Sequence, residues 1–255
     1  LRVRDYDCLI AISNAVRQQG LDRGVGYTKQ YEVIHSFADV KAFVPPTPEQ
    51  RRAVREELRL PQDAFVAISV TRLSRQKSPT DLVAAAARIV ERLPNAHLVI
   101  VGDGPLRDDV VADIAARNLA DNVHMLLARR DVPRLLHAAD LFVLSSRWEA
   151  LGMVYLEAAA TGLACVGTAV DGAVEAVDDG VTGIMMPPEK PEMLAEAVLK
   201  LALDPHLRAK MGAAGIEKAR HFSKENYVQS IDTLYEKLLQ RKGIQTAVSE
   251  AAVPA

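Results

Sequence analysis

Several residue types are scarce in this sequence, and each scarcity excludes a class of protein. Only two of its 255 residues are cysteines, Cys8 and Cys165, and they lie far apart. We therefore expect reduced thiols in a cytosolic protein, with no disulfide framework and no zinc site. The formal net charge is only -2, which gives no electrostatic basis for binding nucleic acid. The six histidines show no spacing typical of metal ligands.

The two ends of the sequence also lack familiar features. The chain starts with Leu1, and residues 1–6 resemble neither a signal peptide nor a capped helix, so we expect it to begin within a longer protein. Residues 244–255 are mostly small and without a period, which predicts a frayed tail. Residues 150–170 are apolar and long enough to span a membrane, but Glu157 and three glycines favour a buried helix, a turn and a buried strand.

Short apolar runs alternate with segments of helical periodicity from residue 64 onward. The expected strands are 64–70, 96–101, 123–127, 141–144, 163–167 and 183–186. The expected helices are 47–58, 80–92, 106–117, 132–138, 153–161, 174–177, 191–203, 206–218 and 224–240. This alternation predicts an α/β fold with a doubly wound parallel sheet. Shorter strands at 7–12 and 31–35 and a helix at 15–21 precede it, and the proline-rich segment 44–48 marks a boundary.

Two carboxylates, Glu149 and Glu157, flank the start of the expected helix 153–161 and are separated by seven residues. In an open parallel sheet, ligands bind where the carboxyl ends of strands meet the amino ends of helices. The free N–H groups of a helix start could hold a phosphate while Glu149 accepts hydrogen bonds from a polyol. That pairing suits a sugar attached to a diphosphate. On spacing alone, a loop carboxylate and an ion-paired helix residue are the commoner outcome.

Two cations, Arg72 and Lys77, directly follow the strand at 64–70. We expect them at the same edge of the sheet as Glu149. A guanidinium can clamp phosphate oxygens with two N–H groups, and an ammonium supplies a point charge. Together they could neutralise a diphosphate leaving group without a metal, although a solvated basic loop is the commoner outcome for such a pair.

Three further features have simpler interpretations. The segment Gly102-Asp103-Gly104 lies between a strand and a helix like a dinucleotide fingerprint, but Arg107 stands where the third glycine would be. Asp171 is expected to be a turn residue that caps the helix at 174–177. A structural role is expected for His35.

Taken in order, the motifs between Ser69 and His221 resemble the donor-binding half of a GT-B retaining glycosyltransferase of family 4. The resemblance rests on Arg72 with Lys77, the segments 99–106, 138–140 and 146–158, Thr161-Gly162, Asp171-Gly172 with Glu175, Asp179-Gly180, Thr182-Gly183, and 220–223. It implies a Rossmann-like, nucleotide-sugar-binding domain over 46–222. Residues 1–45 would be a remnant of the amino-terminal acceptor domain with the crossover, 223–241 a helix crossing back towards that domain, and 242–255 a flexible tail.

The resemblance also implies roles for individual residues. Arg72 and Lys77 would bind the diphosphate and act in catalysis with Glu149, which would hold sugar hydroxyls, and Glu157 would accept the ribose hydroxyls. The sugar and phosphates would contact backbone groups of Ala150, Leu151, Gly152, Met153 and Val154. The base would lie against Ala128, Arg129 and Arg130, largely through their backbone groups.

The family transfers a sugar from a nucleotide diphosphate with retention of configuration, and the resemblance implies no metal and no other cofactor. The donor would be UDP- or GDP-linked, and a carbohydrate or lipid-linked acceptor would bind through the missing amino-terminal half. Peripheral association of the full-length protein with the inner face of the cell membrane is left open. We expect the isolated chain to bind its donor weakly and to be inactive in transfer.

Some positions depart from the pattern of this family. Thr71, Ser78 and Ala128 stand where glycine is frequent, which leaves the identities of the sugar and the base open. Two alternatives keep the same fold: a non-catalytic nucleotide-sugar-binding module and a sugar-nucleotide epimerase. The four charged residues at 72, 77, 149 and 157 argue against the first alternative. A dinucleotide-dependent oxidoreductase is disfavoured by Arg107.

Overall fold

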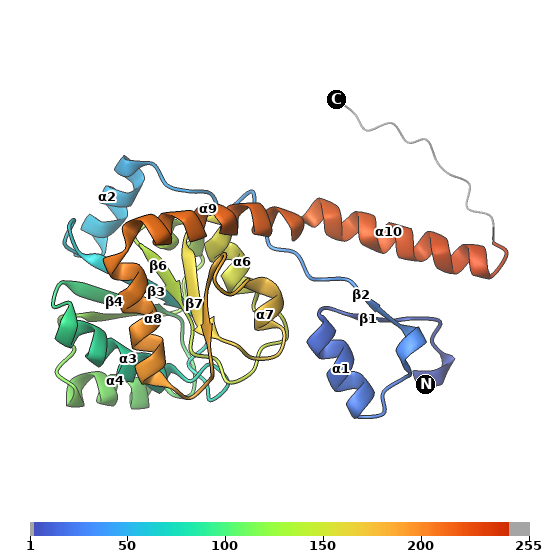
Figure 1. The fold of residues 1–255 in the computed structure, drawn as a ribbon, viewed down its shortest axis with the longest axis horizontal. Helices are drawn as coiled ribbons and strands as arrows, with labels where there is room; N and C mark the ends of the chain where they lie inside the picture. The colour runs from blue at the N-terminus through green and yellow to red at the C-terminus, as the bar shows by residue number, and fades with distance from the viewer. Residues whose placement is uncertain (1–2, 245–255) are drawn as a thin grey trace.

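The computed structural model of the chain describes residues 3–244, and it shows an α/β domain with a smaller amino-terminal unit and a long terminal helix beside it (Figure 1). The large sheet consists of β3 (Phe65–Val70), β4 (Ala96–Val101), β5 (Val123–Leu126), β6 (Leu141–Val143), β7 (Ala164–Thr168) and β8 (Gly183–Met186). Its strand order is β5-β4-β3-β6-β7-β8, and all neighbouring strands are parallel. The predicted doubly wound parallel sheet is therefore confirmed.

Helices follow the strands in the order that the sequence indicates. They are α2 (Pro48–Glu57), α3 (Pro79–Arg92), α4 (Arg107–Ala116), α5 (Val132–Leu136), α6 (Met153–Ala160), α7 (Ala173–Ala176), α8 (Pro191–Leu203), α9 (Pro205–His221) and α10 (Lys224–Arg241). The predicted ends lie within about three residues of these bounds. Helix α2, for example, begins at a capping box in which Thr47 and Gln50 bond each other's backbone N–H groups.

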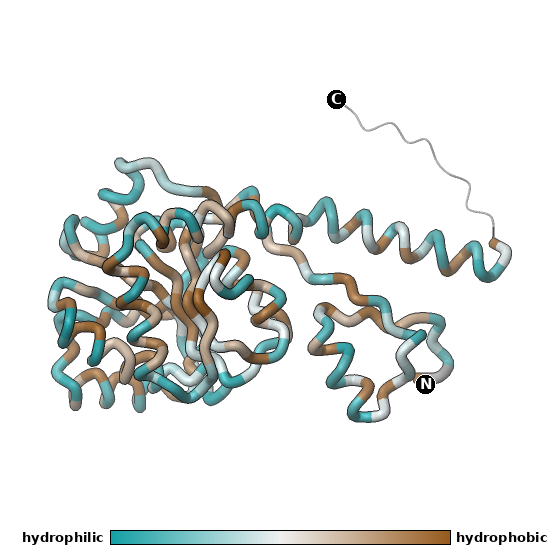
Figure 2. Tube along the Cα trace, viewed as in Figure 1, coloured by the Kyte–Doolittle hydropathy of each residue, from teal (hydrophilic) through white to brown (hydrophobic). Residues whose placement is uncertain are grey.

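The strands are apolar on both faces because helices cover both faces of the sheet. Val66 and Ile68 of β3 face a core formed with α5, α6 and the end of α9, whereas Ala67 faces a second core formed with α3, α4 and α8. Figure 2 shows the brown, hydrophobic strands enclosed by helices with teal outer faces. Parallel strands that are buried on both sides consist of continuous apolar runs, and such runs can be recognised in the sequence.

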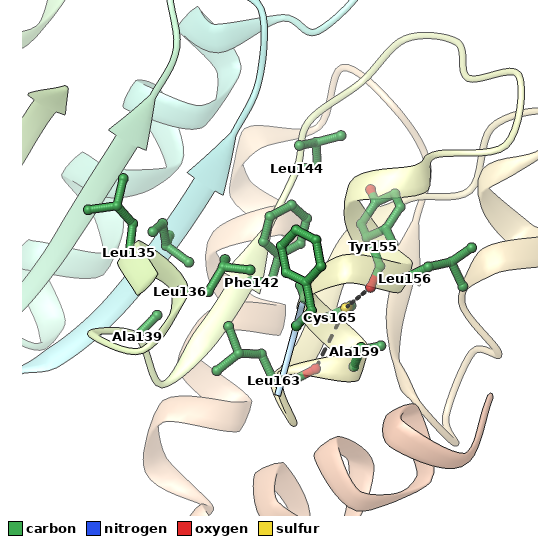
Figure 3. Packing of buried hydrophobic residues seen from close by; sticks show 14 of the residues in the cluster. Leu135, Leu136, Ala139, Phe142, Leu144, Tyr155, Leu156, Ala159, Leu163 and Cys165 are labelled. Atoms are coloured by element: carbon green, nitrogen blue, oxygen red, sulfur yellow. Dashed lines mark hydrogen bonds between the residues drawn. The ribbon is translucent and has the colours of Figure 1, made fainter. Parts of the chain in front are cut away.

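The core beneath α6 is closely packed around aromatic side chains. Tyr155 and Phe142 are both fully buried, and their ring centroids lie 5.6 Å apart in an edge-to-face arrangement. Figure 3 shows these rings together with Cys165, whose thiol contacts the carbonyl oxygens of Tyr155 and Leu163 at 3.7 Å. Burial raises the pKa of this thiol far above its ordinary value. This core fixes helix α6 on the sheet.

The amino-terminal unit contains η1 (Val3–Asp5), β1 (Leu9–Ala11), α1 (Asn14–Asp22), η2 (Thr28–Gln30) and β2 (Tyr31–Val33). The two strands form a separate parallel sheet. Helix α10 extends beyond the large sheet and lies over this unit (Figure 1), with Lys237 Nζ 3.7 Å from Glu32 and Lys242 Nζ 2.6 Å from Asp7. Of the tail expected over 242–255, residues 245–255 lie outside the described residues.

A buried ionic network attaches α2 to the main domain. Arg55 is only 2% exposed, and its guanidinium donates to Asp140 Oδ2 at 2.9 Å and to the carbonyl oxygens of Ala138, Gln62 and Ala64. Arg51 donates to the other oxygen of Asp140 at 2.5 Å. Every charged group of this network is therefore paired, as buried charges must be.

Candidate functional site

The candidate site lies where the strand order of the large sheet reverses. The chain runs from β3 outward to β4 and β5 and then returns to β6, so the loops after β3 and β6 begin on adjacent strands. Hydrogen bonds join these loops: the Arg147 N–H donates to the Gln76 carbonyl at 2.7 Å, and Gln76 Nε2 donates to the Trp148 carbonyl at 3.0 Å. The structure thus brings the predicted cations and Glu149 to one edge of the sheet, at the position where such folds bind ligands.

Glu149 is buried and held by several donors. Its side chain is 5% exposed, and its Oε1 accepts a hydrogen bond from Ser146 Oγ at 2.7 Å and an ion pair from Lys77 Nζ. Ser145 Oγ fixes the backbone at Lys77, because it lies within hydrogen-bond distance of the carbonyl oxygens of Lys77, at 3.0 Å, and Ser78, at 2.9 Å. Lys77 therefore neutralises Glu149 here, and a diphosphate would have to share this ammonium group.

Arg72 presents an unengaged guanidinium at the same edge. The residue is exposed, and within residues 3–244 its side chain has no hydrogen-bond or ionic partner. Its neighbour Leu73 bonds the next loop, because the Leu106 N–H donates to the Leu73 carbonyl at 2.9 Å. Arg72 is thus held by its backbone while its cationic group is free for an anion.

The glycines after β4 are explained by this contact between the two loops. Gly102 has φ +140, and a Cβ on it would lie 1.9 Å from the Thr71 carbonyl oxygen. A Cβ on Gly104 would lie 2.4 Å from the carbonyl oxygen of Leu73. Both glycines therefore allow two backbone segments to approach each other, a role that accounts for them without a dinucleotide.

Glu157 lies on α6 in an environment that disfavours its charge. Desolvation raises its pKa from 4.5 to about 7. In the described part of the chain its carboxylate has no hydrogen-bond or ionic partner. Within those residues, the alternative that Glu157 is an ion-paired helix residue is therefore wrong. A half-buried carboxyl group without a partner, on the helix that begins just after Glu149, is suited to accept hydrogen bonds from a ligand.

Helix α6 begins beside Glu149 without a side-chain cap in the described structure. Its N-cap, Gly152, has φ +80, and the preceding residue, Leu151, is only 1% exposed. Ala150 is exposed, and Met153 and Val154 are half-buried. The first N–H groups of this helix are thus left without a side-chain acceptor, as an anion-binding helix start requires.

The two arginines after β5 differ in their environment. Arg129 donates to Asp131 at 2.6 Å and to Glu57 of α2 at 3.3 Å, and its hydrogen bond to Asp131 is the main cause that lowers the pKa of that carboxyl group to about 2. Arg130 is exposed. The guanidinium of Arg129 is therefore already engaged by carboxylates, and a base at this loop would meet backbone groups more readily than this side chain.

Asp171 was expected to cap α7, and this prediction is wrong. The N-cap of α7 is Gly172, and the Asp171 carboxylate accepts instead the N–H of Glu149 at 3.2 Å. This turn packs closely against the loop after β6: a Cβ on Gly172 would lie only 2.0 Å from the Ala150 carbonyl oxygen, so only glycine fits there. The position of Asp171 two residues before α7 does not show, from sequence alone, that its carboxylate accepts the N–H of a residue in another loop.

Three histidines, namely His35, His97 and His124, make their hydrogen bonds outside the loop of Glu149. His97 and His124 lie near the starts of β4 and β5, with Nδ1 of the first 2.9 Å from Nε2 of the second. His35 Nε2 lies 2.8 Å from Glu175 Oε2, which agrees with the structural role expected for it. Residues 3–244 contain no cluster of three or more histidine, cysteine or acidic side chains that could hold a metal ion. Within the same range, no helix is sufficiently long and apolar to cross a membrane.

Comparison with known proteins identifies the family to which this site belongs. The sequence profile of the family described as "Glycosyl transferases group 1" matches residues 50–218, which is more than half of the chain. The chain belongs to this family. The matched range contains Arg72, Lys77, Glu149 and Glu157. The resemblance to a glycosyltransferase is therefore confirmed, whereas the roles of these four residues stay predictions.

Individual relatives of this group 1 glycosyl transferase chain carry different names. The alpha-D-kanosaminyltransferase of Streptomyces kanamyceticus is 33% identical over 196 residues, covering 74% of this chain and 51% of the relative. A GDP-mannose-dependent phosphatidylinositol monomannoside mannosyltransferase of Corynebacterium glutamicum is 34% identical over 194 residues, covering 72% and 50%. This chain spans about half the length of these curated relatives.

A solved structure agrees with the fold. The crystal structure of Anabaena HepE in complex with UDP superimposes with a TM-score of 0.86 at 26% identity, covering 92% of this chain and 65% of that one.

Proposed function

We propose that this chain is the donor-binding half of a retaining glycosyltransferase that moves a sugar from a UDP- or GDP-linked donor to a carbohydrate or lipid-linked acceptor. The observation that carries the proposal is the pair of carboxylates around the start of α6. Glu149 is pre-positioned by Lys77 and Ser146, whereas Glu157 is unpaired, with its pKa raised to about 7. Both nucleotides stay open, because HepE binds UDP and the Corynebacterium relative is named for GDP-mannose.

Each group at this edge has a role in the proposal. The diphosphate lies between the guanidinium of Arg72 and the N–H groups at the start of α6, and shares the ammonium of Lys77. Glu149 accepts hydrogen bonds from sugar hydroxyls, and Glu157 accepts them from the ribose. The loop at Ala128, Arg129 and Arg130 lies along the base. These assignments place the negative charge of the donor at cations and its hydroxyl groups at carboxylates.

The chemistry follows from these positions. When the bond between the anomeric carbon and the diphosphate oxygen breaks, its electron pair stays on the diphosphate. Arg72 and Lys77 neutralise this developing charge, which is the largest contribution that fixed groups can make to such a reaction. The acceptor hydroxyl attacks from the face that the diphosphate leaves and gives its proton to an oxygen of the departing diphosphate, so the new glycosidic bond forms with retained configuration. We expect no metal to be required.

Acceptor binding and sugar transfer require, in this proposal, a part of the full-length protein that this chain does not contain. The acceptor binds through the other half of the full-length protein, which is cytoplasmic and associates peripherally with the inner face of the cell membrane if its acceptor is lipid-linked. This chain alone binds the donor and does not transfer it. Robust transfer catalysed by the 255-residue chain would contradict this division of labour.

Calorimetric titration of the chain with UDP and with GDP tests the proposal. We expect saturable binding of one nucleotide, with the affinity reduced about tenfold or more in Arg72→Ala and in Glu157→Ala, because each variant removes a charge-assisted hydrogen bond. The matched controls are Arg88→Ala and Glu91→Ala, two exposed residues of α3, which should leave the affinity unchanged. Equal losses in controls and site variants would contradict the proposed site.

A further inference from the structure

Asp171 connects the loop of Glu149 to the amino-terminal unit. Its Oδ2 accepts the N–H of Glu149 at 3.2 Å, and its Oδ1 accepts Nε2 of Gln19 on α1 at 3.1 Å. These two partners lie 22 and 152 residues away in the sequence. One carboxylate thus bridges the candidate site and a helix that belongs to the other unit.

The backbone of Asp171 indicates that this bridge is maintained against local strain. Its φ is +39, in the left-handed region that an L-residue with a Cβ seldom adopts. Glycine would adopt this conformation without strain, but it would provide no carboxylate. A strained residue that persists in a turn is a reason to look for a role of its side chain.

Other contacts hold the same loop between the turn and α1. The Gly172 N–H donates to the Glu149 carbonyl at 3.0 Å, and Ser13 Oγ donates to the Ala150 carbonyl at 2.6 Å. Ser13 is fully buried and is also the N-cap of α1. The peptide groups of Glu149 and Ala150 are therefore fixed by the turn after β7 and by the N-cap residue of α1 in the neighbouring unit.

The start of α1 is itself attached to the main domain by Glu175. This carboxylate accepts the N–H groups of Asn14 at 3.1 Å and Ala15 at 3.2 Å, and His35 at 2.8 Å. Burial opposes its charge, but these hydrogen bonds together hold the pKa of Glu175 below its ordinary value. Helix α1 is thus docked by its amino end, and Gln19 reaches Asp171 only in this docked position.

We propose that Asp171 is a positioning residue that makes the geometry of Glu149 depend on the docking of α1. When Gln19 holds Oδ1, the carboxylate is oriented to hold the Glu149 N–H, and the Glu149 side chain is aligned for sugar hydroxyls. When α1 moves away, this restraint is lost. The inference deepens the proposed function and rests on it: recognition of the sugar, as distinct from the nucleotide, is coupled to the position of the amino-terminal unit.

Amide hydrogen exchange of the segment 149–152 tests the coupling without any ligand. We expect faster exchange of the Glu149 amide in Asp171→Gly, which keeps the backbone conformation and removes the carboxylate, and also in Gln19→Ala. The double variant should exchange no faster than Asp171→Gly alone, because both changes break one chain of contacts. Unchanged exchange in Asp171→Gly would overturn the inference.

Two further variants keep the result interpretable. Asp171→Asn retains the turn and can keep both contacts, because its Oδ1 accepts the Glu149 N–H while the Gln19 amide turns over to accept its N–H₂, so its exchange should stay close to that of the wild type. Gln19→Ala tests the coupling even if the glycine variant folds poorly. Asp179→Gly is the matched control, because this residue also accepts a backbone N–H, that of Met185 at 2.9 Å, beside the edge strand β8. This control should leave the exchange of 149–152 unchanged.

Ligand binding separates the inference from the proposed function. For Asp171→Gly we expect unchanged affinity for UDP or GDP, and about a five- to tenfold loss in the preference for UDP-glucose or GDP-mannose over the bare nucleotide, as for one positioning hydrogen bond. The only tryptophan of the chain, Trp148, precedes Glu149, so its fluorescence reports on this loop. A wild-type chain that binds no nucleotide would contradict the proposed function, whereas a full sugar preference in Asp171→Gly would overturn only the inference.

Discussion

Replacing Glu157 by Gln should stabilise this protein at neutral and alkaline pH. Desolvation on α6 raises the pKa of this carboxyl group from 4.5 to about 7, so the folded state keeps a proton that the unfolded chain has already lost. Stability therefore falls as the pH rises from about 4.5 to about 7, and it stays reduced above that range. Glutamine has nearly the same shape and does not titrate.

The size of the effect follows from the same shift in pKa. Its difference from the ordinary value corresponds to a gain of about 2 to 3 kcal/mol in the free energy of unfolding of Glu157→Gln at pH 8, after allowance for partial contact with solvent. For a chain of this length, that gain raises the melting temperature by about 5 to 10 °C. At pH 4, where the carboxyl group is neutral in both states, the two proteins should be almost equally stable.

Urea denaturation at pH 4 and pH 8, followed by circular dichroism, measures this difference. Glu91→Gln on the exposed surface of α3 is the matched control and should show no such dependence on pH. A Glu157→Gln protein less stable than the wild type at pH 8, or an equal gain in stability at both pH values, would contradict a raised pKa of Glu157. The expected gain in stability accompanies a loss of nucleotide binding, as is common for polar groups held unpaired at a binding site.

Three other predictions concern charged groups. Lys77→Met should lower the free energy of unfolding by about 3 to 5 kcal/mol, because it leaves Glu149 buried without its cation; adding Glu149→Gln should restore much of the loss in urea denaturation. Arg55→Met should cost about 3 kcal/mol or more by the same measurement, whereas Arg92→Met, at an exposed ion pair, should cost less than about 1 kcal/mol. The affinity for UDP-glucose should rise with pH up to about 7, because Glu157 ionises to accept ribose hydroxyls, and binding below that pH should release a proton. Calorimetry in buffers of different ionisation enthalpy would detect the proton release. An affinity independent of pH would contradict the prediction.

The fold could be predicted from the sequence because its strands are buried on both faces. A run such as Phe65–Val70 is apolar throughout, and helix starts such as Thr47 and Ser13 carry their own capping side chains. These signals are local in the sequence, so they survive without knowledge of the tertiary structure. The edge of the sheet at which Arg72 and Glu149 meet follows from the order of strands alone.

The partners of the site residues could not be predicted in this way. The loop of Arg129 is expected to line the base largely through its backbone. That Glu57 of α2 and Asp131 engage the Arg129 side chain could not be foreseen, because no pattern in the sequence shows that α2 lies beside this loop. Asp171 has the composition of an ordinary capping turn, and its contacts with Glu149 and Gln19 depend on the packing of three separate elements. Long-range pairs of this kind are set by tertiary structure, which local signals do not contain.

A crystal structure of the chain with UDP or GDP bound would test the central claim most directly. We expect the ribose hydroxyls within hydrogen-bond distance of the Glu157 carboxylate, and the diphosphate between Arg72 and the N–H groups at the start of α6. A nucleotide bound elsewhere, for instance with its phosphates on the loop of Gly102 and Gly104 and no contact to Glu157, would contradict it.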